Sequence, residues 1–455
     1  MWGKFLNINM SLKCDECSNQ TNCRVGMSNR DVQPLKFPCK NCGTLIGIYL
    51  TAKAADTLDN RAIAAIQAGK GPSDIYFNQG AKWTITNASE VPLEGKFDTS
   101  LDFVDLHLDF PVVFGTYIPG NTPYMQAVGR SSGEMAAFHR DRLGIINAQY
   151  KKYPQVAELI SKYIKGFHGP FSEFAKKRFK IEAKSQKIED LNAVLYKVVS
   201  HYVLPFTLPD DNQSLVRKFT SAVIDLMKHK EAETASFLQE LHDTEFVTNL
   251  QRDCLKVYKP IFDAELPLRP ALFLDVDTAY AAGMTAMRVS SQDFTEYREV
   301  YKDMSEVLNR QLVLVAGIAN LIERGDHNAF AMRISKKGKQ LSPASLSEYA
   351  DIPLGNKLQD LDSGWHTIDA LALDNELRNA IAHNKVDYND VTQVITYYPK
   401  LEGMEREKKS EIQLLEYMHR LLALFREMHR LHHLVKCINY ALLIEPGASM
   451  VRRRS

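Results

Sequence analysis

Two Cys-x-x-Cys pairs near the N-terminus constrain the fold of this chain more than any other feature. The pairs are Cys14/Cys17 and Cys39/Cys42, and 21 residues separate them. A Cys-x-x-Cys turn presents two thiolates on one side, so two such turns can complete the tetrahedral shell of a zinc ion. Four thiolates leave no open position on the metal, which indicates a structural site. Because about 40 residues cannot build a stable core alone, we expect zinc to hold residues 10–50 together.

The residues around the cysteine pairs support this interpretation and leave one alternative open. Gly43 directly follows Cys42, which suits a knuckle turn whose backbone amides approach the sulfurs and which needs a positive φ. Over residues 12–50 the pattern resembles a zinc ribbon. Cys23 could replace one of the four ligands. The ribbon could be purely structural, or it could also contact nucleic acid or a partner protein.

Length and composition indicate an ordinary globular protein. A chain of 455 residues is too long for one small core, so we expect about two to four domains. The net charge of +1 argues against a histone-like nucleic-acid binder but allows a local basic patch. The cysteine usage favours a reducing compartment over a disulfide framework, and we expect a cytoplasmic protein. No segment reaches the roughly 20 apolar residues of a membrane helix, so we expect no membrane span.

Hydrophobic patterning predicts a mainly α fold with a small N-terminal β region. Residues 51–130 have mixed character, with a strand expected over Lys82–Asn87, where apolar and polar residues alternate. A helical middle region, broken by proline clusters, follows over residues 131–285. Residues 286–446 are expected to form a C-terminal helical domain. Its elements are expected to be long helices over 291–323, 363–383 and 410–443, with a strand over 391–397.

A short arginine–histidine run in the C-terminal domain is the strongest functional signal in the sequence. It contains Arg378, Asn379 and His383, all on the expected helix over 363–383. At 100° per residue, the apolar residues of this helix fall within one arc of about 100°, which we expect to be buried. Asn379 and His383 lie on the opposite side. Arg378 flanks them, and its long side chain can reach toward a phosphate bound on that side.

These three residue types can cleave RNA without a metal ion. A histidine titrates near neutral pH and can take a proton from a ribose 2′-hydroxyl or give one to the leaving 5′-oxygen. An arginine stays charged and grips phosphate oxygens, which stabilises the charge of the transition state. Asn379 could orient the histidine or hydrogen-bond the phosphate. The alternative is a solvated helix face on which Asp374 and Arg378 form an i,i+4 ion pair.

The residues around this run resemble the C-terminal part of a HEPN domain (higher eukaryotes and prokaryotes nucleotide-binding superfamily). That family's motif is an arginine, four to six residues and a histidine, often with a polar residue directly after the arginine. Arg378, Asn379 and His383 match all three elements. The resemblance rests on the segment Leu377–Asn384, the pair Asp387-Tyr388 and the strand Thr392–Tyr398.

The resemblance covers roughly residues 286–446 and implies a helical bundle and a metal-independent endoribonuclease that acts on RNA. It implies that Arg378 stabilises the phosphate, that Asn379 orients and that His383 acts as general acid/base. It also implies a composite site, in which two motifs meet across a homodimer. Members commonly serve as toxins or as effectors of defence against phage. The middle region would then sense a phage-derived or protein trigger.

A non-catalytic binding protein is the competing hypothesis, because some members of this family are inactive binding modules. The zinc ribbon and the helical middle region would then form a scaffold for RNA or protein. The basic loop from Arg333 to Lys339 could hold an RNA backbone, or it could be a solvated loop.

Two further patterns are weaker. The segment Phe273–Thr278 matches the nucleophile motif of haloacid-dehalogenase-like phosphatases. The long helices and prolines around it do not provide the parallel sheet of that fold, so we expect a turn with Asp277 as a capping residue. His429 and His433 lie one turn apart on the last helix. Because no carboxylate partner is identifiable, we expect surface histidines rather than a metal pair.

Overall fold

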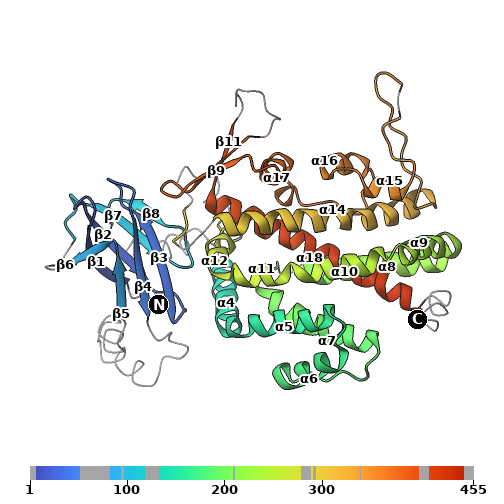
Figure 1. Ribbon diagram of the computed structural model, residues 1–455, viewed down its shortest axis with the longest axis horizontal. Coiled ribbons are helices and arrows are strands. Elements are labelled where there is room, and N and C mark those ends of the chain that lie inside the picture. Colours follow the sequence, from blue (N-terminus) through green and yellow to red (C-terminus); the bar gives the residue numbers. More distant parts are fainter. Residues whose placement is uncertain are drawn as a thin grey trace. The chain divides into compact units, whose positions relative to one another are not determined.

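The chain forms two compact units, each assembled from segments that are distant in the sequence (Figure 1). The computed structural model describes residues 7–51, 82–93, 97–118, 122, 133–208, 211–277, 288–290, 294–338, 340–398 and 409–444. One unit, here called the β-rich unit, takes its residues from 1–150, 264–296 and 384–419. The other, the helical unit, takes its residues from 151–263, 297–383 and 420–455. Helices account for most of the described residues, which confirms the predicted mainly α fold.

Two sheets near the N-terminus form the larger part of the β-rich unit. One sheet has the strand order β6-β1-β2-β7-β8, in which only β2 and β7 pair in parallel. The other has three antiparallel strands in the order β3-β4-β5. The strands are β1 (Asn7–Cys14), β2 (Gln20–Gly26), β3 (Val32–Pro38), β4 (Leu45–Thr51), β5 (Lys82–Thr86), β6 (Ala88–Val91), β7 (Asp102–His107) and β8 (Val113–Gly115). The strand expected at Lys82 is confirmed by β5.

The apolar faces of the two sheets share one core. Ile46, Ile48 and Leu50 are buried at alternate positions of β4, as the two-residue period of a strand requires. Met10 and Leu12 of β1 belong to the same buried cluster, although they come from the other sheet. Because β5 pairs with β4 and β6 pairs with β1, the strand pairing continues past residue 50, where we expected a domain boundary.

Two helices and a third sheet complete the β-rich unit, and buried arginines attach the helices. The elements are α4 (Gly133–Gln149), α12 (Glu265–Phe273), β9 (Val386–Asn389), β10 (Val394–Tyr397) and β11 (Ser410–Gln413). Arg269 of α12 is fully buried, and it donates to Glu265 at 2.7 Å and to Asp109 at 2.5 Å. Burial alone would raise the pKa of Asp109, but the neighbouring Arg269 holds it below its usual value. Arg142 of α4 pairs in the same way with Asp275 at 2.7 Å.

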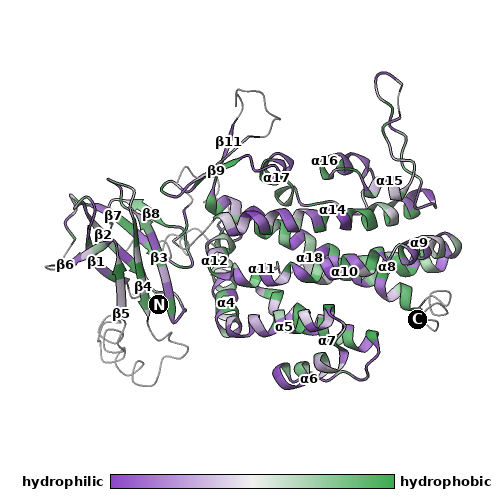
Figure 2. Ribbon diagram, in the orientation of Figure 1, coloured by the Kyte–Doolittle hydropathy of each residue, from purple (hydrophilic) through white to green (hydrophobic). Residues whose placement is uncertain are grey.

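The helical unit contains most of α14 (Phe294–Arg324) and α18 (Leu414–Ile444), each 31 residues long. From Leu421 to Val435, every residue of α18 except Arg430 is buried, so this stretch runs through the core of the unit. Apolar residues are interspersed with polar ones along this helix, as the alternating green and purple of its visible part shows (Figure 2).

Shorter helices pack with α14 and α18. The α-helices are α5 (Tyr153–Ile164), α6 (His168–Phe179), α7 (Ile188–Val203), α8 (Asp211–His229), α9 (Glu231–Asp243), α10 (Phe246–Lys256), α11 (Tyr258–Asp263), α15 (Leu346–Ala350), α16 (Leu354–Lys357) and α17 (Asn375–Ala382). Single 3₁₀ turns lie at Tyr150–Lys152, Leu204–Phe206, Leu358–Asp360 and Ala370–Ala372.

The prediction of one long helix over 363–383 was wrong. The segment contains the 3₁₀ turn at Ala370–Ala372 and then the eight-residue α17. Two aspartates end the continuity, because their side chains bind backbone amides that a longer helix would use. Asp369 accepts from the amide of Leu371, and Asp374 accepts from the amide of Leu377, each at 2.9 Å.

Two expectations for the last helix were also wrong. The helix expected over 410–443 begins only at Leu414, because the preceding residues pair with β10 as strand β11. His429 and His433 are buried rather than exposed, because this part of α18 is covered on all sides.

The strand expected over 391–397 forms only from Val394 onward, after a turn that contains the buried Gln393.

Arg269 generates a prediction about the stability of the β-rich unit. Replacing it in Arg269→Leu leaves the buried Asp109 without its arginine, whereas Glu265 keeps its ion pair with the buried Arg30, so we expect a loss of about 3–5 kcal/mol at neutral pH. The loss should shrink as the pH falls below about 4, because Asp109, whose pKa the arginine lowers, then becomes protonated and needs no cation. Hydrogen–deuterium exchange of the α12 backbone amides, measured at several pH values, gives this loss of stability.

The matched control is Arg140→Leu on α4. Arg140 is exposed and, among the described residues, pairs with the exposed Asp141, so its loss should cost about 0–1 kcal/mol. Equal protection of α12 in Arg269→Leu and in the control would contradict the role given to Arg269.

Candidate functional site

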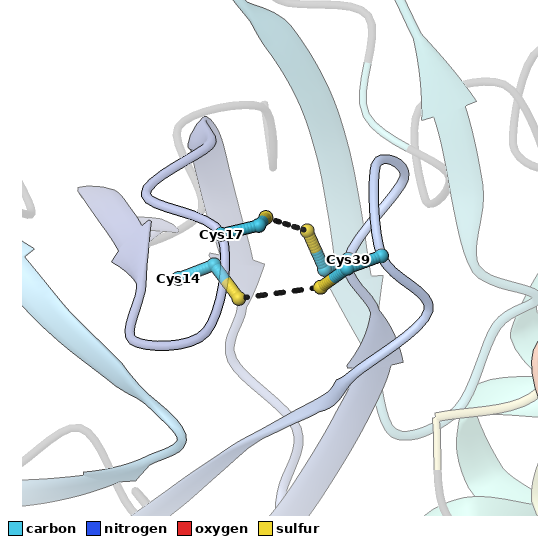
Figure 3. Close-up of side chains that lie close together, drawn as sticks. Cys14, Cys17 and Cys39 are labelled. Carbon is cyan, nitrogen blue, oxygen red and sulfur yellow. Dashed lines mark hydrogen bonds between the residues drawn. The ribbon is translucent and has the colours of Figure 1, made fainter.

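The four cysteines of the predicted metal site lie together in the β-rich unit. Cys14 ends β1 and Cys39 follows β3, so the two turns extend from the ends of strands in different sheets. All four sulfur atoms lie within 4.8 Å of one another. Cys17 Sγ is 3.6 Å from Cys39 Sγ, and Cys14 Sγ is 3.7 Å from Cys42 Sγ (Figure 3). A tetrahedral metal with bonds of about 2.3 Å to sulfur places its ligands about 3.8 Å apart, so the spacing fits a metal ion.

The two cysteine turns have the same backbone conformation. The amide of Ser18 donates to the carbonyl of Cys14, and the amide of Gly43 donates to the carbonyl of Cys39, both at 2.9 Å. Ser18 has φ 59° and Gly43 has φ 78°. The positive φ expected of Gly43 is therefore confirmed. No pattern in the sequence indicates the positive φ of Ser18, because a non-glycine residue seldom adopts this conformation.

Cys23, the alternative ligand, lies outside this cluster. It is fully buried in the apolar core on β2, and burial followed by the charge of Asp105 raises the pKa of its thiol well above the usual value. In the cluster itself, the hydrogen bond with the Thr44 hydroxyl, 3.2 Å away, lowers the pKa of Cys42 to about 6. Burial raises the pKa of Cys39 to about 11. Cys39 would therefore become a thiolate at neutral pH only with a cation bound, so the four cysteines could act together as thiolates only around a metal ion.

The predicted catalytic residues lie on α17 in the helical unit. Leu377, Ala380 and Ile381 form the buried side of this helix. Asn379 and His383 are exposed, and Arg378 is half-buried. The predicted division of this segment into a buried and an exposed side is therefore observed, although the helix is much shorter than expected. Two helical turns are enough to form both sides.

The surroundings of Arg378 differ from the alternative that we considered. Its guanidinium forms an ion pair with Glu306 of α14 and donates to the side-chain oxygen of Asn379 at 3.1 Å. Asp374, the expected i,i+4 partner, instead caps α17 and pairs with Arg420 of α18 at 2.9 Å. Among the described residues, the i,i+4 ion pair of that alternative is therefore not formed.

The ion pairs with Glu306 and Arg420 fix the position of α17 and the direction of its arginine. Glu306 is 72 residues from Arg378, and Arg420 is 46 residues from Asp374. No local pattern in the sequence indicates either contact. His383 is the C-cap residue directly after α17, and its backbone amide donates to the carbonyl of Asn379 at 3.0 Å.

The weaker sequence signals have structural explanations. Asp275 pairs with Arg142 at 2.7 Å and lies 3.4 Å from His419, and the residues after α12 form a turn, as expected. In the basic loop, Arg333 pairs with Asp360 at 2.6 Å. Lys339 lies outside the described residues.

Comparisons with known proteins give no family for this chain. No protein-family model matches the sequence, and neither a curated protein nor a solved structure is significantly similar to it. Among the described helices, none has both the length and the apolar composition that crossing a membrane requires.

The cysteine cluster generates a prediction about metal content. We expect the purified protein to hold one divalent metal ion per chain and Cys39→Ser to lose it, because three thiolates bind the ion far more weakly than four. Cys23→Ser is the matched control, since it also removes a buried thiol near the cluster. Elemental analysis by mass spectrometry measures the ion. Loss of metal from Cys23→Ser, or retention in Cys39→Ser, would contradict the ligand set.

Proposed function

We propose that this protein is a metal-independent endoribonuclease whose site is built on α17. The observation that carries the proposal is that Asn379 and the C-cap residue His383 are exposed at the end of one capped helix, with the partly buried Arg378 directly beside Asn379. The hydrogen bond from Arg378 to the side-chain oxygen of the exposed Asn379 at 3.1 Å supports it, because a guanidinium held in this way loses less entropy when it binds a phosphate. The spacing of the three residues, which resembles the HEPN motif, points to the same chemistry.

The proposed reaction needs a base, an acid and a stabiliser of negative charge. His383 takes the proton of the ribose 2′-hydroxyl, and the 2′-oxygen forms a bond to phosphorus. The bond from phosphorus to the 5′-oxygen breaks, and that oxygen takes a proton from an acid. The products are a 2′,3′-cyclic phosphate and a 5′-hydroxyl. Arg378 binds the phosphate oxygens as their charge grows, and Asn379 keeps the guanidinium in place.

We propose that the acid comes from a second copy of the chain. A single α17 presents one histidine, whereas the reaction uses a base and an acid at opposite sides of the phosphate. A homodimer that brings two copies of α17 together would supply both. Such an enzyme would act on cytoplasmic RNA as a toxin or as a defence effector under the control of a phage-derived or protein trigger.

We propose that the metal at the four cysteines is zinc with a structural role. Four sulfur ligands suit zinc, and they leave no position for a substrate or for water. The two turns extend from β1 and β3, so a bound ion would link the edges of two sheets. Zinc would therefore stabilise the β-rich unit without taking part in the cleavage.

One observation favours a binding protein as the second candidate function. Arg378 already has a carboxylate partner in Glu306, so its charge is neutralised before any phosphate arrives. A phosphate would have to compete with that partner or bind beside it. A module that binds RNA or protein without cleaving it would not have to displace Glu306 from Arg378.

RNA cleavage distinguishes the two candidates. We expect the wild-type protein to cleave transfer RNA or total RNA in buffer with EDTA, and His383→Ala to lose about 10²- to 10⁴-fold in rate because the general base is gone. Gel analysis of the RNA products over time measures the cleavage rate. The matched control is His229→Ala, which replaces an exposed histidine at the end of α8.

Equal rates for wild type and His383→Ala would exclude the proposed site. Absence of cleavage, together with RNA binding that His383→Ala leaves unchanged, would favour the binding protein.

A further inference from the structure

A polar cavity in the helical unit lies apart from the residues discussed above. Its volume is about 230 Å³, and its walls come from α5, α7, α10 and α18 and from the start of α6. Three of its lining side chains, Lys165, His168 and Arg252, carry or can carry positive charge. Within the ranges that the structure describes, none of the residues that line the cavity is acidic.

The three basic residues lack the carboxylate partners that nearby surface cations have. Lys162 on α5 pairs with Glu158 at 3.2 Å, and Lys256 on α10 pairs with Asp253 at 2.9 Å. Within the described part of the chain, the side chains of Lys165, His168 and Arg252 form no ion pair. Cations that converge on a cavity without a counter-charge raise the local concentration of anions.

The floor of the cavity is rigid because a buried hydrogen-bonded chain holds it from behind. Asn192 accepts from the hydroxyl of Tyr163, and Gln251 donates to the hydroxyl of Tyr196 at 2.6 Å. Tyr196 in turn lies 3.2 Å from Nε2 of the buried His432. A floor fixed in this way does not have to order itself when a ligand binds.

The histidines in the hydrogen-bonded chain behind the floor add no positive charge to the cavity. His432 lies 2.8 Å from the hydroxyl of Tyr258, which is also 2.9 Å from His429. Burial, followed by the charge of Lys436, lowers the pKa of His432 well below its usual value and that of His429 to about 3. Both histidines are therefore neutral at pH 7. The positive charge near a ligand therefore comes from the three basic residues at the cavity and from Lys436, whose ammonium lies over the ring of Tyr196.

One donor in the cavity wall has no acceptor. The amide nitrogen of Asn439 is buried, and it makes no hydrogen bond to any described residue. A buried donor without an acceptor costs free energy, so a shift of the Asn439 side chain toward the cavity would be favoured where a ligand oxygen can accept from it.

We propose that this cavity binds a small phosphomonoester. Lys165, His168 and Arg252 would hold the phosphate, since Arg and Lys are the side chains that bind phosphate most strongly. Asn439 would donate to an oxygen of the ligand, and Asn192 and Gln251 would face its polar body. A volume of about 230 Å³ is smaller than that of a drug-sized site, so it fits a compact ligand such as a sugar phosphate. The proposal does not depend on RNA cleavage by α17.

Isothermal titration calorimetry of the full chain with D-ribose 5-phosphate tests the proposal, with D-ribose as the uncharged probe. We expect ribose 5-phosphate to bind, ribose not to bind, and Arg252→Ala to weaken the binding about tenfold or more. Arg252 is exposed, so this change should leave the fold intact. Lys256→Ala is the matched control on the same helix, because its side chain lies outside the cavity and pairs with Asp253.

A second titration with phosphatidic-acid vesicles distinguishes a lipid headgroup from a free phosphomonoester. Vesicle binding that Arg252→Ala weakens, without binding of ribose 5-phosphate, would keep the phosphate site and make a lipid its source. Absence of binding to both probes would overturn the proposal. So would an affinity that Arg252→Ala and Lys256→Ala change equally, because the phosphate would then bind elsewhere.

Discussion

Burial of α18 within the helical unit is the constraint on which the arrangement of this unit depends. A helix that is covered on all sides from Leu421 to Val435 gives every neighbouring helix an apolar surface to pack against. The same burial forces its polar residues into internal partnerships. Glu427 accepts from the buried His366 at 2.8 Å, and Arg426 donates to the carbonyl of Phe206 at 2.8 Å. Polar groups on a central helix thus select the positions of the segments around it.

The proposed catalytic helix is positioned by this framework, and its own sequence contributes little to its place. An isolated helix of eight residues is not stable in water. In this chain α17 forms because Leu377, Ala380 and Ile381 are buried and because Asp374 both caps the helix and pairs with Arg420 of α18. The exposed side is then free for Asn379 and His383. Chemistry on a short helix requires this support, because a small shift of the reacting groups costs much of the rate.

The parts that could be predicted from the sequence are those with a local physical signature. The cysteine pairs, the positive φ after Cys42 and the alternation of apolar residues in β5 each depend on residues that are close in the chain. The helix over 363–383 was wrongly predicted because the capping power of Asp369 and Asp374 was not weighed against the apolar period.

The features that could not be predicted from the sequence depend on contacts between distant segments of the chain. The pairing of Arg378 with Glu306 and the joining of two sheets across residue 50 have no local signal. The burial of His429 also escaped prediction, because its polar character suggested the surface. Its environment depends on Tyr258, which lies 171 residues earlier in the chain.

The most direct test of the proposed mechanism uses the substrate instead of the protein. Once a cleaved RNA position is mapped, the same RNA is made with a single 2′-deoxynucleotide on the 5′ side of the cleaved bond. The account predicts that cleavage stops at that position, because the attacking oxygen is gone, and continues in the unmodified RNA to give a 2′,3′-cyclic phosphate. Cleavage of the deoxy-substituted position at an unchanged rate would mean that water attacks the phosphate. That result would contradict the role of His383 as the base for a ribose hydroxyl.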